Sequence, residues 1–182
     1  MPRRRVVPRP PLPRWAIVWF PPSALVGDIE RFRETHDPMA RNIPAHVTLV
    51  FPFASTLGMV QVAAHIRRAI VRWPSLPVRL EGLGHFHADW VHVRMSLGRL
   101  AVTALHDRLY RGALAPFLRP ELPYEPHVTI GRAGDPRACD AIIGAARVQR
   151  LDAPRDAVMR TLALCRVYGD GRVTAEMEFA LG

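Results

Sequence analysis

Lysine is absent from the chain, and its absence excludes several reactions that begin with a lysine side chain. All 25 basic residues among the 182 are arginine. A ligase that carries AMP on a lysine and an enzyme that forms a Schiff base both need the lysine amine as a nucleophile. A P-loop needs its lysine on the phosphates of a nucleotide. Any ligation by this chain would therefore be independent of ATP and would run a phosphodiester cleavage in reverse.

Cysteines and long hydrophobic segments are also scarce. Cys139 and Cys165 are the two cysteines, which are too few for a disulfide framework or a zinc site, and we expect both to be small buried residues. No apolar segment approaches the ~20 residues that span a bilayer. The apolar segment 15–20 is too short for the core of a signal peptide. We therefore expect a soluble, cytoplasmic protein that does not interact with membranes.

The remaining composition is that of one basic globular domain. The chain is 49% hydrophobic, and its 182 residues are enough for one well-packed core. The net charge of +9 and the pI near 11.2 favour anionic partners such as nucleic acid or phosphorylated metabolites. Residues 1–13 contain five prolines and four arginines. This composition predicts a flexible basic tail before a single domain at 14–182.

The tripeptide His-Val-Thr occurs twice, at residues 46–48 and 127–129, each time within a short apolar segment. In a β-strand, side chains at positions i and i+2 point to the same face. Each motif therefore presents one imidazole beside one hydroxyl, while its valine points the other way into a core. Two such strands side by side would bring two histidines and two hydroxyls to one site. Such a site has the acid, the base and the hydrogen-bond donors needed to cleave a phosphodiester without a metal.

The pattern of hydrophobic residues predicts an α+β fold. Strands are expected at about 15–20, 46–51, 78–84, 90–96, 128–132, 158–168 and 173–181, and helices at about 23–35, 56–73, 100–117 and 136–148. Asp135 followed by Pro136 is typical of a helix N-terminus, and the segment 169–171 is typical of a hairpin turn. A helix precedes each motif strand, which favours two pseudo-equivalent lobes.

These paired His-x-Thr motifs resemble the two-histidine (2H) phosphoesterase superfamily, and most of all its branch of bacterial 2'-5' RNA ligases and cyclic phosphodiesterases. The resemblance extends from about Trp15 to the C-terminus and includes the segments 14–22, 46–53 and 127–132. It implies two antiparallel sheets with helices outside and a central cleft, with one motif from each lobe.

The resemblance also implies a set of roles for the motif residues. His46 and His127 would be the catalytic acid and base, and Thr48 and Thr129 would bind the phosphate. No cofactor and no metal would be needed. The substrate would be an RNA terminus or a nucleotide with a 2',3'-cyclic phosphate or a 2'-5' bond, and we expect the protein to be a monomer.

Further candidates surround the two motifs. The resemblance implies that Arg132 binds phosphate, but strict alternation would place it opposite His127 unless Gly131 permits a β-bulge. The first motif has Phe51 at the position of this arginine. Phe51, Phe86 and Tyr168 are candidates for stacking on a base, although aromatic residues of this kind are commonly core residues.

Other interpretations stay open. Either motif alone would fit a hydrogen-bonded, half-buried histidine without a catalytic role. His85 and His87, with His92 nearby, have the spacing of metal ligands but lack a further ligand, and we assign them no metal. The protein could also be a non-catalytic module that binds RNA or nucleotides, or a phosphodiesterase for a non-nucleic cyclic phosphate. A strong salt dependence of binding to single-stranded RNA would separate these two alternatives.

Overall fold

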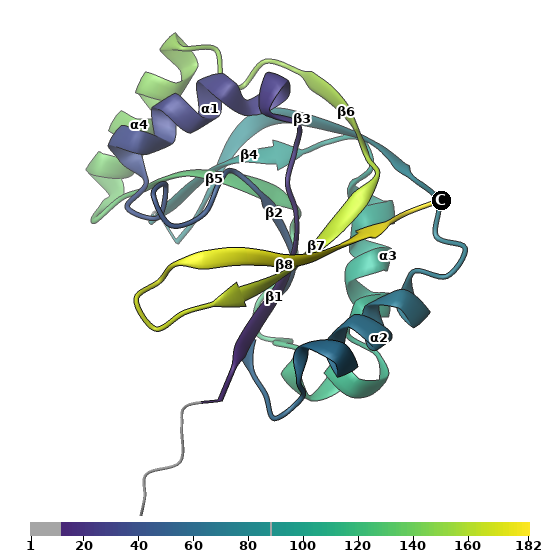
Figure 1. Ribbon diagram of the computed structural model, residues 1–182. Coiled ribbons are helices and arrows are strands. Elements are labelled where there is room, and N and C mark those ends of the chain that lie inside the picture. The colour runs from purple at the N-terminus through teal and green to yellow at the C-terminus, as the bar shows by residue number, and fades with distance from the viewer. Residues whose placement is uncertain (1–11, 88) are drawn as a thin grey trace, which may run out of the picture.

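The computed structural model describes residues 12–87 and 89–182, and two four-stranded antiparallel sheets form its centre (Figure 1). The first sheet has the order β2 (Val47–Ala54), β1 (Arg14–Trp19), β7 (Thr161–Val167) and β8 (Val173–Ala180). The second sheet has the order β5 (His127–Arg132), β4 (Trp90–Met95), β3 (Leu76–Phe86) and β6 (Arg155–Met159). The predicted basic tail lies outside the described residues except for Leu12 and Pro13.

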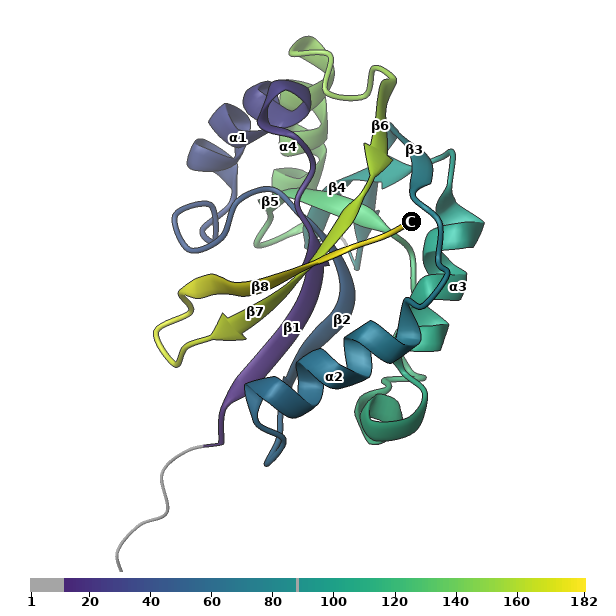
Figure 2. The ribbon, with the colours of Figure 1, turned by 45° about the vertical axis from the view of Figure 1, so that its right-hand side comes forward.

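Two helices follow a strand of one sheet and pack on the other sheet. Helix α1 (Ser23–His36) follows β1 of the first sheet but packs on β5 of the second, and α4 (Pro136–Val148) packs on β4 of that second sheet. Helix α3 (Arg99–Leu109) follows β4 of the second sheet but packs on β2 of the first, beside α2 (Met59–Ala69). Figures 1 and 2 show α1 and α4 on one side of the molecule and α2 and α3 on the other. The predicted α+β fold with two lobes is confirmed, and each sheet is covered by a helix that follows a strand of the other sheet.

Two predicted elements differ from the structure. The expected strand 158–168 is two strands, β6 and β7, which separate at Arg160 and belong to different sheets. The expected helix 100–117 ends at Leu109 and is followed by a 3-10 helix, Gly112–Phe117, which begins at a glycine with a φ of +58° and contains Pro116. In both places the hydrophobic pattern continues while the backbone changes direction, so the pattern alone did not reveal the break.

Strand β1 separates the main core from a second, smaller apolar cluster. Its residues Trp15, Ile17 and Trp19 face the main core between sheets and helices. On the other face, Ala16 and Val18 pack with residues of β7, which are Ala163 and Cys165. Both cysteines are buried, as expected. No helix within the described residues has the length and hydrophobicity needed to cross a membrane.

The two motif strands, β2 and β5, are edge strands of their sheets and contact each other. Edge strands carry backbone groups without a partner strand, and on β2 side chains satisfy three of them. The hydroxyl of Tyr124 donates to the carbonyl of Thr48 at 2.9 Å, and Nδ1 of His106 donates to the carbonyl of Leu49 at 2.7 Å. The amide of Phe51 donates to the hydroxyl of Tyr110 at 2.9 Å. These bonds attach the outer edge of β2 to α3 and to the segment that leads into β5.

Candidate active site

His46 lies immediately before β2, and its ring is held by the backbone of its own loop. Its Nδ1 lies 2.8 Å from the carbonyl oxygen of Pro44. Because a carbonyl can only accept a hydrogen bond, Nδ1 carries the proton, and Nε2 keeps its lone pair. The ring is half-buried, with the Phe20 ring edge-on at 6.3 Å between centroids. His46 therefore presents Nε2 as the nitrogen that can exchange a proton with a ligand.

His127 begins β5 and repeats this arrangement. Its Nδ1 donates to the carbonyl oxygen of Glu125 at 2.6 Å, again two residues earlier in the chain. Its ring is also half-buried. The two motifs thus share a tripeptide and also a backbone hydrogen bond that selects the same tautomer of each histidine.

A cavity of about 380 Å³ lies between the two sheets and brings the motifs together. His46, Thr48 and Thr129 line it. His127 is two residues from Thr129 on the same face of β5, and its charge contributes to lowering the pKa of His46. One wall consists of small apolar residues of the first sheet, which are Ala16, Val18, Val167 and Val173. The rest of the lining includes polar and aromatic residues, among them Arg14, Arg33, Asp37, Trp90 and Tyr168.

Both motif histidines are neutral at neutral pH, because their pKa values are lowered. Burial lowers the pKa of His46 to about 4, and the Pro44 carbonyl opposes this shift, as does Asp37, while Arg33 and His127 add to it. Burial also lowers the pKa of His127, against the opposing effect of the carbonyl and carboxylate of Glu125. An anion bound in the cavity would favour the protonated form of either ring. The site is therefore suited to take up a proton when an anionic ligand arrives.

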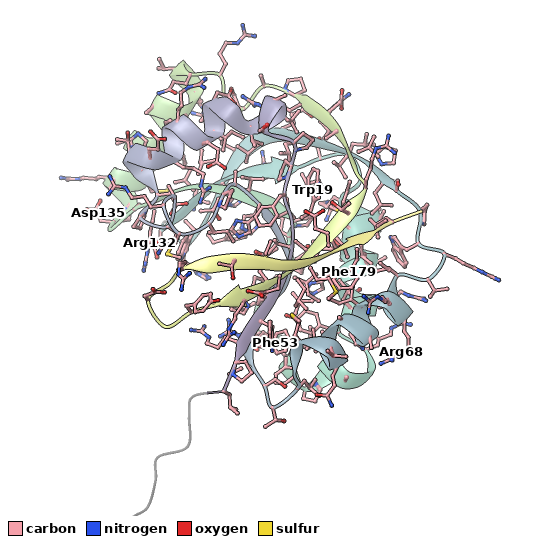
Figure 3. The ribbon with its side chains drawn as sticks, in the orientation of Figure 1. Trp19, Phe53, Arg68, Arg132, Asp135 and Phe179 are labelled. Atoms are coloured by element: carbon pink, nitrogen blue, oxygen red, sulfur yellow. The ribbon has the colours of Figure 1, made fainter. Side chains whose placement is uncertain are left out.

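Arg132 lies on the face of Thr129, contrary to strict alternation, but does not line the cavity. The pairing of β4 with β5 shifts between Gly131, opposite Val91, and Thr129, opposite His92. This shift is the β-bulge considered from the sequence, and it returns Arg132 to the face of Thr129. Its guanidinium lies 4.7 Å from the centre of the Trp90 ring, and its Nε lies 3.4 Å from Asp89. Trp90 lines the cavity and Arg132 does not, so Arg132 contacts the cavity only through the Trp90 ring. Figure 3 labels Arg132 near Asp135.

The three predicted stacking residues have different surroundings. Tyr168 lines the cavity, and the guanidinium groups of Arg172 and Arg166 lie 4.1 Å and 5.2 Å from the centre of its ring. Phe86 does not line the cavity, but its ring is edge-on to that of His127 at 5.0 Å. Phe51 packs edge-on against His106 and Tyr124, at 6.4 Å from each, and is also outside the lining.

The sequence model of the 2'-5' RNA ligase superfamily matches residues 21–171. The chain belongs to the 2'-5' RNA ligase superfamily. This membership confirms the resemblance to the two-histidine phosphoesterases that the repeated motif indicated.

Curated relatives and solved structures resemble the chain over most of its length. A "putative phosphoesterase" of Geobacillus kaustophilus is 27% identical over 122 residues, which are 65% of this chain and 69% of that protein. One of Bacillus licheniformis is 24% identical over 171 residues, 93% of this chain and 99% of that protein. Escherichia coli LigT complexed with 3'-AMP has a TM-score of 0.65 at 20% identity, covering 93% of this chain and 98% of LigT. A protein of Thermus thermophilus has a TM-score of 0.65 at 18% identity, covering 92% of this chain and 97% of its own. The solved structures of LigT and of the Thermus thermophilus protein therefore have the same fold as this chain.

Three residues in or near the cavity were not assigned a role from the sequence. Trp90 lines the cavity, and so does Arg33, whose side chain is 1% exposed. His92 was considered only as a metal ligand, yet it is buried, lies opposite Thr129, and is 4.7 Å from His127 between ring centroids. A signal for Arg33 was present, because it follows Phe32 on the buried side of a predicted helix and stands four residues before an aspartate. His92 and Trp90 needed the register of β4 against β5, which the sequence does not contain.

Histidine is abundant around the site, but its arrangement does not suggest a metal centre. Within residues 12–87 and 89–182, no group of three histidine, cysteine, aspartate or glutamate residues is placed to hold a metal ion. His85 and His87 are exposed at the end of β3. His92 is buried against Phe86, with their rings stacked at 4.4 Å.

Proposed function

We propose that this protein is a phosphoesterase that opens 2',3'-cyclic phosphates or cleaves 2'-5' phosphodiester bonds at RNA ends or in small nucleotides, or forms them in reverse. One observation carries the proposal. His46 and His127 have matching Nδ1 hydrogen bonds to backbone carbonyls, which leave Nε2 of each ring available beside a cavity that both motif threonines line. Membership of the superfamily and the phosphoesterase names of the relatives support the reaction class.

The proposed mechanism uses the two imidazoles on opposite sides of the phosphorus. One neutral imidazole removes a proton from the attacking water, and the other, protonated, donates a proton to the leaving ribose oxygen. The phosphodiester anion stabilises the imidazolium that burial alone disfavours. In the reverse direction the two histidines exchange these roles, so the direction of the reaction decides which is the base.

The threonines and the cavity wall suit the rest of such a substrate. The hydroxyls of Thr48 and Thr129 line the cavity from the two sheets and would donate to the non-bridging oxygens, where negative charge develops. The small apolar residues of β1 and β7 and the ring of Tyr168 offer an apolar surface for a nucleoside. The fold is shared with E. coli LigT, whose solved structures contain ATP or 3'-AMP, which supports a nucleotide substrate.

The test is turnover of nucleoside 2',3'-cyclic phosphates, and of an oligonucleotide that ends in one, in the presence of EDTA. We expect one monophosphate isomer as product, and its loss in His46→Ala and in His127→Ala. The exposed His85 provides the matched control, because His85→Ala removes an imidazole outside the site. If neither cyclic phosphate is cleaved, retained RNA binding would indicate the non-catalytic module. Absence of both would indicate a non-nucleic phosphodiester.

A further inference from the structure

Helix α1 contacts the elements of both motif histidines. One side of it packs on β5, the strand that begins with His127. The approach is close, because a Cβ on Gly131 would lie 3.2 Å from Cβ and 3.3 Å from the carbonyl oxygen of His36, at the end of the helix. The position of α1 against the second motif strand is therefore set by backbone contact.

The same helix holds the loop that carries His46. The Arg33 guanidinium donates to Asp37 through Nε at 3.0 Å and to the carbonyl of Ile43 through Nη2 at 3.0 Å. Its Nη1 donates to Oε2 of Glu30 at 2.9 Å. The other oxygen of Glu30 accepts a hydrogen bond from the amide of Ala45 at 2.5 Å. Arg33 and Glu30 thus hold the backbone on both sides of Pro44.

Pro44 is the residue whose carbonyl binds the His46 ring. The carbonyl of Ile43 and the amide of Ala45 fix the two peptide groups that flank it. We propose that Arg33 and Glu30 are positioning residues that fix the Pro44 carbonyl, and with it the orientation and tautomer of His46 relative to His127. This inference rests on the proposed function for its catalytic consequence, but not for its structural one.

The chemistry of Arg33 fits this positioning role. A buried charge is costly unless it is paired and its donors are used, and here three donors of the guanidinium have acceptors in fixed directions. A lysine at this position would keep the charge but would lose the planar fork. The charged and titratable groups that act on His46 are Arg33, Asp37 and His127. Arg33 lowers and Asp37 raises the pKa of His46, so the two charges act on the ring in opposite directions.

The experiment follows the imidazole nitrogens of the free protein by ¹⁵N NMR over a pH titration. In the wild type we expect His46 in the Nδ1–H tautomer. In Arg33→Lys and in Glu30→Ala we expect a mixture of the two neutral tautomers at His46, because the Pro44 carbonyl no longer fixes the proton on Nδ1, with His127 unchanged. Asp28→Asn is the matched control, because Asp28 lies on the same helix but pairs with Arg155, at 2.5 Å, and not with the loop.

Turnover of a 2',3'-cyclic nucleotide supplies the second measurement. Glu30 does not line the cavity, so Glu30→Ala should lower kcat by about a hundredfold, as displacement of a catalytic group does, with little change in KM. An unchanged His46 tautomer in Glu30→Ala would overturn the proposal. Because Glu30 is one-third exposed, this variant should fold even if Arg33→Lys does not. The NMR result stands whether or not the wild type cleaves a cyclic phosphate, so the two proposals can fail separately.

Discussion

The two motif strands carry the same three residues on different supports. Thr48 of β2 pairs with Val18, whereas Thr129 of β5 pairs with the buried imidazole of His92. His46 stands before its strand in a loop that Arg33 and Glu30 hold, whereas His127 lies within its strand against the rings of Phe86 and His92. The shared part is the tripeptide and the carbonyl two residues before it.

This difference separates what the proposed chemistry requires from what the fold supplies locally. An imidazole with a fixed tautomer and a hydroxyl two residues later are present twice, as proton transfer in both directions requires. The loop of the first motif is held by hydrogen bonds from charged side chains of α1. The histidine of the second motif is held by aromatic packing within its sheet. Substitutions in one motif, or in the residues that support it, therefore test which residues the proposed reaction needs and which only hold the motif in place.

The largest effect is expected when either half loses its imidazole. We expect His46→Ala and His127→Ala each to lower kcat/KM by about 10²–10⁴-fold, the contribution of general acid–base catalysis. Both proteins should still fold, since each ring is half-buried at the edge of a sheet. Steady-state kinetics on a 2',3'-cyclic nucleotide, with circular dichroism of each variant, measures this. Near-normal activity in either variant would contradict the paired mechanism.

Removal of the hydroxyls should have a smaller effect that is similar in the two halves. Thr48→Val and Thr129→Val keep the side-chain shape and the strand, and each removes one donor to the phosphate. We expect a loss in kcat of about 10²-fold for each, as for other donors to a developing negative charge. Thr103→Val, on the exposed side of α3, is the control. A loss at one threonine alone would show that a single lobe holds the phosphate.

The repeated motif was predictable from the sequence because it depends on local geometry. The two-residue spacing places His127 and Thr129 on one face whatever the rest of the fold does. The N-cap at Asp135 was predictable for the same reason, and its carboxylate accepts a hydrogen bond from the amide of Ala138. The β-bulge that re-aims Arg132 was considered at Gly131, and the register of β4 and β5 shows it.

The other features depend on contacts between distant segments. The separation of β6 from β7 at Arg160 occurs because the two strands join different sheets, which a continuous apolar segment does not reveal. Arg33 donates a hydrogen bond to the carbonyl of Ile43, ten residues later, in a loop whose path the sequence did not indicate. Trp90 reaches the cavity because the bulge pairs it with Arg132. Each of these needed the register or the packing of the folded chain.

The pH dependence of activity should reflect the lowered pKa values of both histidines. In the free enzyme, His46 has a pKa of about 4 and His127 a pKa below its ordinary value, both because of burial. The active form needs one protonated ring, so kcat/KM should be highest on the acid side of the ordinary histidine pKa of about 6.5. Above that pH it should fall by about tenfold per unit. An optimum above pH 8 would contradict the proposed acid.

The smallest effect concerns stability and His92, an imidazole at a position where the first sheet has an aliphatic residue. Its Nδ1 is buried without a hydrogen-bond partner among the described residues, and burial, followed by the charge of His127, lowers its pKa to about 3. The equivalent position in the first sheet, paired with Thr48, is occupied by Val18. Because Nδ1 gains no partner, the substitution His92→Val removes an unsatisfied polar atom while it loses packing against Phe86, so the net change at neutral pH should be modest.

The change with pH should be clearer than the change at neutral pH. A histidine whose folded pKa is lowered favours folding above its unfolded pKa of about 6.5, and this stability is lost as the pH falls toward the folded pKa. For His92 the loss between pH 7 and pH 5 is about 2 kcal/mol. His92→Val should therefore flatten the dependence of the unfolding free energy on pH by about this amount, while His46 and His127 keep part of the slope. Urea unfolding at pH 7, 6 and 5, with the exposed His85→Ala as the control, measures it. If the dependence of the unfolding free energy on pH is unchanged in His92→Val, His92 is already protonated or solvated in the folded protein. His127 would then not be packed against a buried, neutral His92.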